Sequence, residues 1–104
     1  MLHSMRVIAL RTIKQFIGKH DDAREPALAW YRQVLGADWA SPADVKREIG
    51  SASILKDGRA VFNIGGNKYR LVVEVQYQAG IVWVKFVGTH AQYDRIDVET
   101  VNDH

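Results

Sequence analysis

The spacing of hydrophobic residues changes once along this chain of 104 residues, close to residue 53. Before that point, apolar residues recur every three or four positions, which is the period of an α-helix. After it they alternate with polar residues, which is the period of a β-strand. Because the helical half precedes the strand half, we expect helices that are segregated from an antiparallel sheet, the α+β class.

The N-terminal half predicts one short strand and three short helices. Residues 6–9 are β-branched in the middle and predict a brief strand. A helical stripe follows over 10–20, and a second helix runs from the acidic start at 21 to a stop at Gly36. A serine and a proline then introduce a third helix over 42–49.

The C-terminal half predicts a β-meander, because four alternating stretches are separated by turn residues. The expected strands are 53–55, 59–64, 68–77 and 81–90, and a short turn or helical piece follows at 91–95. Gly65 and Gly66 supply positive φ angles in the second turn. This meander completes the expected fold, an N-terminal strand and two to three helices packed on a C-terminal sheet.

Composition limits the class of protein further. The chain is 47% hydrophobic and 25% charged, which is ordinary for one globular domain, and we expect residues 1–104 to form it. Without cysteine there are no disulfides and no sulfur-bound zinc. His3, His20 and His104 lack metal-ligand spacing, and we interpret them as structural or incidental. No run is long enough to span a membrane and no secretory signal is evident, so we expect a soluble cytoplasmic protein.

Positive charge is concentrated in the sheet-forming half. Residues 56–90 carry five Lys or Arg against two carboxylates, a local balance of +3, whereas residues 91–104 carry one Arg against four carboxylates, a balance of −3. A local excess of this kind attracts polyanions, although a normally solvated β-surface would look the same.

The last hairpin predicts where these cations lie. Its three-residue turn at 78–80 sets the register so that Arg70 faces Gly88 and Lys68 faces His90. Side chains of one parity share one face of a sheet, so Lys68, Arg70 and His90 are expected to project together. Gly88 would leave an opening beside Arg70.

The same register makes Tyr77 the partner of Ile81 and assigns the two faces of the hairpin. Lys85 falls on the face that packs against the helices, and we expect its ammonium to reach out at the edge. The opposite face carries a smaller apolar floor beside the cations, formed by Val72, Val84 and Phe86.

Two cations and an imidazole around an open patch suit a phosphodiester substrate. Arg and Lys stabilise charge on a pentavalent phosphorane, and His moves a proton near neutral pH. In RNA the 2′-hydroxyl is itself a nucleophile, so no metal is required, and Tyr93 could stack on a base or join the proton transfer. The alternative is that His90 is a surface residue at a strand end and that the cations are only a solvated face.

Two stretches of sequence carry a specific resemblance. They read VFNIGGNKYRL at 61–71 and FVGTHAQYD at 86–94. In this order they resemble the HigB-type toxins of the RelE-like superfamily, which belong to bacterial type II toxin–antitoxin systems, and the similarity extends over roughly residues 6–100.

The resemblance implies a RelE-like ribonuclease that cleaves mRNA on the ribosome without a metal or other cofactor, and a helix-turn-helix antitoxin of the HigA type as its partner. It implies that Arg70 stabilises the scissile phosphate, that His90 performs acid–base chemistry and that Tyr93 is the nearby aromatic. Lys68 is the implied phosphate contact. Weaker candidates for binding RNA are Asn67, Lys56 and Arg59.

Two other classes of function remain open at this stage. In a non-catalytic module that binds RNA or the ribosome, the same cations would only hold phosphate. In a protein-interaction domain, they would dock on an acidic partner. Mapping RNA ends separates the nuclease from both alternatives.

Overall fold

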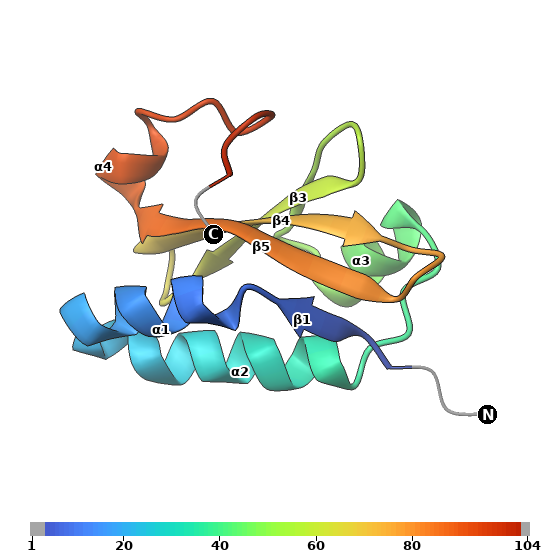
Figure 1. Cartoon of the computed structure of the whole chain (residues 1–104), viewed down its shortest axis with the longest axis horizontal. Helices are drawn as coiled ribbons and strands as arrows, with labels where there is room; N and C mark the ends of the chain where they lie inside the picture. Colours follow the sequence, from blue (N-terminus) through green and yellow to red (C-terminus); the bar gives the residue numbers. More distant parts are fainter. Residues whose placement is uncertain (1–3, 103–104) are drawn as a thin grey trace.

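Five strands form one mixed sheet in a computed structural model that describes residues 4–102 (Figure 1). The strands are β1 (Arg6–Ile8), β2 (Ser53–Ile54), β3 (Arg59–Ile64), β4 (Tyr69–Gln76) and β5 (Ile81–Thr89). Their order across the sheet is β1-β5-β4-β3-β2, and only β1 runs parallel to its neighbour. The expected meander is confirmed, and the N-terminal strand extends it at the β5 edge.

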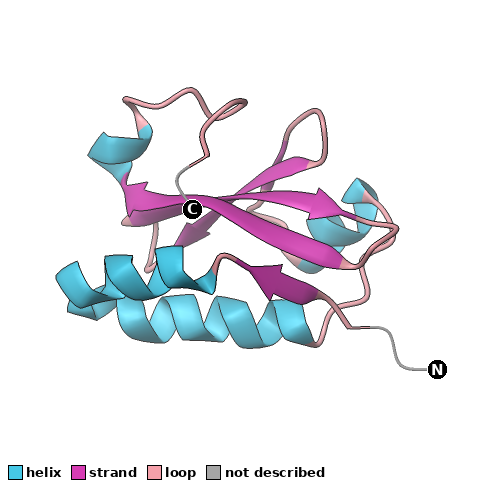
Figure 2. Cartoon of the chain, in the orientation of Figure 1, coloured by secondary structure: helices cyan, strands magenta, loops and turns pink. Residues whose placement is uncertain are grey.

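The helical elements lie mainly on one side of this sheet, as Figure 2 shows. They are α1 (Leu10–Lys19), the 3₁₀ turn η1 (Asp21–Ala23), α2 (Arg24–Leu35), α3 (Pro42–Glu48) and the short α4 (His90–Tyr93). We call the face toward α1 and α2 the inner face and the opposite one the outer face. The α+β class is confirmed. Within residues 4–102, no helix is long and apolar enough to cross a bilayer.

The inner face holds the main hydrophobic core. Leu71, Val73 and Val84 of the sheet are fully buried there together with Ile13 of α1 and Val34 of α2. These helices bury one stripe each, as their sequence spacing predicts. The Phe62 ring of β3 completes this core: it packs edge-on against Trp30 of α2 and nearly parallel to Trp39 of the α2–α3 loop.

The outer face has a smaller apolar cluster and a cover of its own. Val61, Val72 and Phe86 are buried in it beneath the C-terminal segment 94–102, which supplies Ile96, Val98 and Val101. The sequence did not predict this cover, because residues 94–102 lack the periodicity of a helix or strand.

Two buried cations hold the C-terminal segment down. The Arg59 guanidinium donates to the carbonyl oxygens of Val98 at 3.0 Å and Val101 at 2.9 Å. The Lys85 ammonium lies 3.1 Å from the amide oxygen of Asn102 and 4.1 Å from the centroid of the Trp83 ring. Each charge therefore has polar partners, which a buried charge requires.

The hairpin register differs from the prediction near the turn and agrees with it near the cations. The loop has four residues, so Gln76, not Tyr77, pairs with Ile81. A bulge opposite Val72 and Val73 restores the expected register, and Arg70 faces Gly88 as predicted.

Because of the longer loop and the bulge, two side chains lie on the face of the sheet opposite to the one predicted. Val84 belongs to the inner core rather than to the outer apolar floor. Lys85, expected on the inner side, contacts Trp83 and Asn102 beneath the C-terminal segment. An extra residue in one strand reverses the face to which the following side chains of that strand point. The wrong face assignments are therefore confined to the part of the hairpin between the bulge and the turn.

Candidate active site at the α4 end of the sheet

Arg70 occupies the outer face at the end of the sheet where α4 begins. It pairs with Asn63 of β3 and Gly88 of β5, and its side chain is half-buried. The guanidinium donates to the carbonyl oxygens of Asn67 at 2.9 Å and Tyr69 at 3.3 Å. Both bonds use one nitrogen, NH1, so the remaining N–H groups of the fork can reach a phosphate.

The Tyr93 ring lies beside this guanidinium. The Arg70 carbon Cζ is 5.9 Å from the ring centroid, within the range of a cation–π contact. Tyr93 is half-buried and packs against the outer apolar cluster. The structure therefore places Tyr93, a candidate from the sequence, against Arg70.

A capping box fixes the start of α4. The Thr89 hydroxyl accepts a hydrogen bond from the Gln92 backbone N–H at 3.1 Å, and the Gln92 side chain accepts one from the Thr89 N–H at 2.8 Å. This reciprocal pair satisfies two backbone donors of the helix start. The geometry holds His90 and Tyr93 one turn apart in the same short helix.

His90 has a carboxylate partner within that helix. Its Nδ1 lies 3.2 Å from an Asp94 carboxylate oxygen, and both side chains are exposed. A carboxylate can only accept, so in the neutral imidazole this hydrogen bond places the proton on Nδ1 and the lone pair on Nε2. An imidazole oriented in this way is equipped to act as a general base.

Lys68 does not join this group, and the expected convergence of Lys68, Arg70 and His90 is wrong in that respect. The strand begins at Tyr69, and the Lys68 ammonium is bonded to Asp22 of η1, between α1 and α2. The Tyr69 hydroxyl donates to the other oxygen of the same carboxylate. Lys68 and Tyr69 thus tie the β3–β4 turn to the helices.

The shared carboxylate changes the titration of all three groups. Hydrogen bonds from Lys68 and from Tyr69 lower the pKa of Asp22 below its usual value. The same carboxylate raises the pKa of Lys68 and, because it accepts from the neutral phenol, raises the pKa of Tyr69.

The three weaker RNA-binding candidates lie in different surroundings. Asn67 is exposed in the β3–β4 turn at φ 81°, and its carbonyl oxygen holds Arg70. Lys56 is exposed, 3.5 Å from the Glu99 carboxylate. Arg59 is only 8% exposed and is occupied with the C-terminal segment. Asn67 is the one of these three that contacts Arg70.

The expected opening at Gly88 is filled by neighbouring side chains. A β-carbon there would lie 2.4 Å from the Phe86 ring and 3.0 Å from the Gln92 side-chain oxygen. Gly88 is needed because these two groups cross over it. The glycine thus brings α4 close to the sheet beside Arg70.

Two acidic residues of this region were not identified from the sequence as partners of the candidate site residues. Asp94 could have been found, since His90 and Asp94 stand four residues apart, the spacing at which helical side chains meet. Asp22 could not, because its partners lie more than 45 residues away along the chain.

The remaining histidines have no metal-binding arrangement among the described residues. Within residues 4–102, no three His, Asp or Glu side chains gather as metal ligands would. His20 stacks on Phe16. His3 and His104, interpreted from the sequence as structural or incidental, lie outside the described residues.

Comparisons with known proteins identify the family. A family model described as HigB_toxin, the RelE-like toxic component of a toxin–antitoxin system, matches residues 23–96. The curated proteins "mRNA interferase toxin HigB" of Escherichia coli K12 and "mRNA interferase HigB" of Shigella flexneri are each 26% identical to this chain over 92 residues. These alignments cover 86% of this chain and 88% of each relative.

The architecture is consistent with the RelE-like fold. It is a small mixed sheet with two helices on one face. Because the family model matches well over half of the chain, the protein belongs to the HigB toxin family. The family resemblance expected from the two sequence stretches is thereby confirmed.

Proposed function

We propose that this toxin acts as an endoribonuclease that cleaves mRNA and thereby arrests translation. The observation that carries the proposal is the contact of the Arg70 guanidinium with Tyr93 of α4, the short helix that begins with His90, the partner of Asp94. The names of its curated relatives, mRNA interferases, support the same activity. RNA fits this site because the sugar carries its own nucleophile.

In the proposed reaction, His90 Nε2 removes the proton of a ribose 2′-hydroxyl, and Asp94 stabilises the imidazolium that forms. The 2′-oxygen attacks the adjacent phosphorus. Arg70 hydrogen-bonds the equatorial oxygens of the phosphorane, where negative charge develops. The bond to the 5′-oxygen breaks, and that oxygen takes a proton from a water molecule, to which the imidazolium returns the proton removed from the 2′-hydroxyl. The products are a 2′,3′-cyclic phosphate and a 5′-hydroxyl end.

Tyr93 and Asn67 have positioning roles in this scheme. The Tyr93 ring lies against the guanidinium, so it limits the directions in which Arg70 can point and offers a flat surface for a base. The Asn67 carbonyl oxygen holds the guanidinium from the other side. We assign no step to Lys68, Lys56 or Arg59.

The proposal includes three partners and a location. We infer that the toxin works on mRNA held by the ribosome, that a helix-turn-helix antitoxin of the HigA type neutralises it, and that both act in the cytoplasm. The family supports an antitoxin partner in general.

The test is to map RNA ends in cells after brief induction of the wild type, Arg70→Ala and His90→Ala. We expect new 5′-hydroxyl ends in mRNA from the wild type only, with growth arrest that both substitutions relieve. Lys14→Ala is the control, because it removes an exposed cation of α1, which covers the face of the sheet opposite to Arg70. Arrest without new ends would instead assign the toxin a role as a non-catalytic RNA- or ribosome-binding module.

A further inference from the structure

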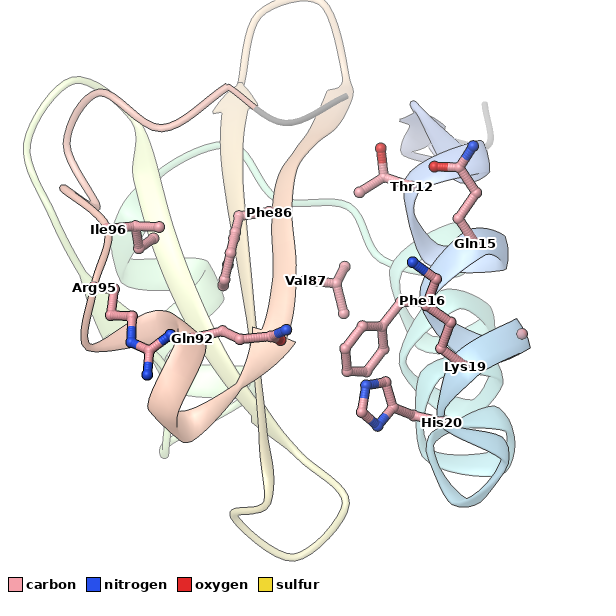
Figure 3. A pocket seen from close by; sticks show the side chains of 11 residues that line it. Thr12, Gln15, Phe16, Lys19, His20, Phe86, Val87, Gln92, Arg95 and Ile96 are labelled. Carbon is pink, nitrogen blue, oxygen red and sulfur yellow. The ribbon is translucent and has the colours of Figure 1, made fainter.

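A second recess lies beside the candidate active site, between α1 and the β5–α4 junction, and Figure 3 shows it. Its volume is about 900 Å³. Phe16, Lys19 and His20 line one wall, and Gln92 and Arg95 belong to the other. We call it the α1 groove. Recesses of this size accommodate a drug-sized ligand, so at least one nucleotide fits.

The groove exists because the first strand is short. β1 pairs with β5 only at Ile81, Val82 and Trp83, and then the chain leaves the sheet to form α1. Ala9, with φ 70°, makes this change of direction. Beyond Trp83 the edge of β5 therefore faces the side chains of α1 instead of another strand.

The groove combines flat aromatic surface with positive charge. The Phe16 and His20 rings are stacked, with centroids 4.3 Å apart and planes 22° from parallel, and both side chains are half-buried. Lys19 and Arg95 are exposed. Among the described residues that line the groove there is no carboxylate. Its charge therefore favours an anionic occupant.

The groove adjoins the candidate active site at Gln92. Gln92 lines it and stands directly before Tyr93, while its side chain lies over Gly88, the strand partner of Arg70. At the other end the His20 ring lies 5.7 Å, between centroids, from the ring of Tyr69, which belongs to the inner core. A strand that leaves the site past α4 would enter this groove.

We propose that the α1 groove binds the stretch of single-stranded RNA that flanks the cleaved bond, with a base stacked on the Phe16–His20 pair and phosphates held by Lys19 and Arg95. A nucleotide supplies both a flat ring and an anion, and base stacking on aromatic side chains tolerates any sequence. The inference rests on the proposed nuclease function and extends it to substrate binding.

The experiment measures cleavage of a defined message in a purified translation system that contains ribosomes. Lys19→Ala/Arg95→Ala is compared with Arg11→Ala/Lys14→Ala, which removes two exposed cations of α1 that do not line the groove. We expect the groove pair to cleave about tenfold more slowly, because two phosphate contacts are lost, and the control pair to stay within about twofold of the wild type.

A second measurement locates the RNA directly. The same message, with a 2′-O-methyl group at the cut site and 4-thiouridine beside it, is irradiated with the wild-type toxin, and the cross-linked peptide is identified. We expect the peptide that contains Phe16 and His20. This readout does not require cleavage, so it tests the groove even if the nuclease proposal fails.

The outcomes separate the two proposals. If the wild type leaves the message intact, the nuclease proposal fails and the cross-link alone decides the groove. If the wild type cleaves and both double variants match it, without a cross-link to α1, the groove proposal is overturned. It is also overturned if the groove pair cleaves normally but escapes a co-expressed antitoxin, which would assign the groove to a protein partner.

Discussion

The two faces of the sheet differ in the kind of side chain that they bury. The inner face is apolar throughout and buries its side chains against α1 and α2, with Phe62 between two tryptophans. The outer face has three buried apolar residues, flanked by charged ones at both ends. Arg59 stands at the end that the C-terminal segment covers, and Arg70 at the α4 end.

The comparison shows how one sheet serves both stability and chemistry. A large, closely packed core tolerates a second face on which charges are held in place by hydrogen bonds. On that face the same residue type has two roles. The buried Arg59 has its donors directed at backbone carbonyls, whereas Arg70 keeps part of its guanidinium for a ligand.

The largest effect on stability is expected on the inner face. Phe62→Ala removes a fully buried ring from between Trp30 and Trp39 and leaves a cavity, so the free energy of unfolding should fall by about 3–5 kcal/mol. Denaturant titration measures it. Phe62→Leu, which fills more of the space, should lose less; equal losses would show that packing around this ring is not what holds the inner face.

A smaller loss is expected from the covered end of the outer face. Arg59→Ala leaves two carbonyl oxygens without their donor, and the free energy of unfolding should fall by about 1–3 kcal/mol. The amides of 96–102 should also exchange with solvent faster. The control is Lys56→Ala, which breaks only an exposed ion pair to the same segment and should cost less than about 1 kcal/mol. Equal losses of unfolding free energy in Arg59→Ala and Lys56→Ala would contradict the role given to Arg59.

The smallest effect is expected at Asp22, where the β3–β4 turn meets the helices. Because its pKa is lowered in the folded state, the contribution of Asp22 to stability is complete above its ordinary pKa of 3.8. That contribution disappears as the pH falls through the lower folded value. Wild type should therefore melt slightly above Asp22→Asn at pH 6, and the two curves should meet in strong acid. Asp21→Asn serves as the control for loss of one neighbouring carboxylate. If the difference in melting temperature between wild type and Asp22→Asn grew as the pH fell, the stabilising role of the Asp22 carboxylate would be refuted.

The sequence predicted the elements of the fold well and the details of the hairpin less well. Periodicity placed the strands and the three longer helices, because one buried stripe or face was sufficient to define each. It did not place the start of α4, which begins at His90, where the sequence predicted the end of a strand. It misjudged the four-residue turn, since a bulge between the turn and Arg70 has no marker in the sequence. The register at Arg70 nevertheless agreed, because the longer loop and the bulge compensate for each other.

The candidate site was predicted where contacts are local and missed where they are distant. Arg70, His90 and Tyr93 lie at one end of a single hairpin and its following helix turn, so strand order alone brings them near. Lys68 departs from them because Asp22, remote in sequence, attracts its ammonium. Arg59 is buried because residues 98–101 return over the sheet, which no local pattern announces.

The most direct test of the account measures cleavage rate and unfolding free energy on the same variants, Arg70→Ala and Glu74→Ala. Both residues lie on the outer side of β4, but Glu74 is paired with Arg59 and Trp83, away from α4. We predict that Arg70→Ala slows cleavage by at least about a hundredfold, as loss of a charge-stabilising donor does, and changes stability by less than about 1 kcal/mol. Glu74→Ala should cleave at nearly the wild-type rate. Equal rates for the two variants, or a loss of activity that follows a loss of stability, would contradict the assignment of chemistry to the α4 end of the outer face.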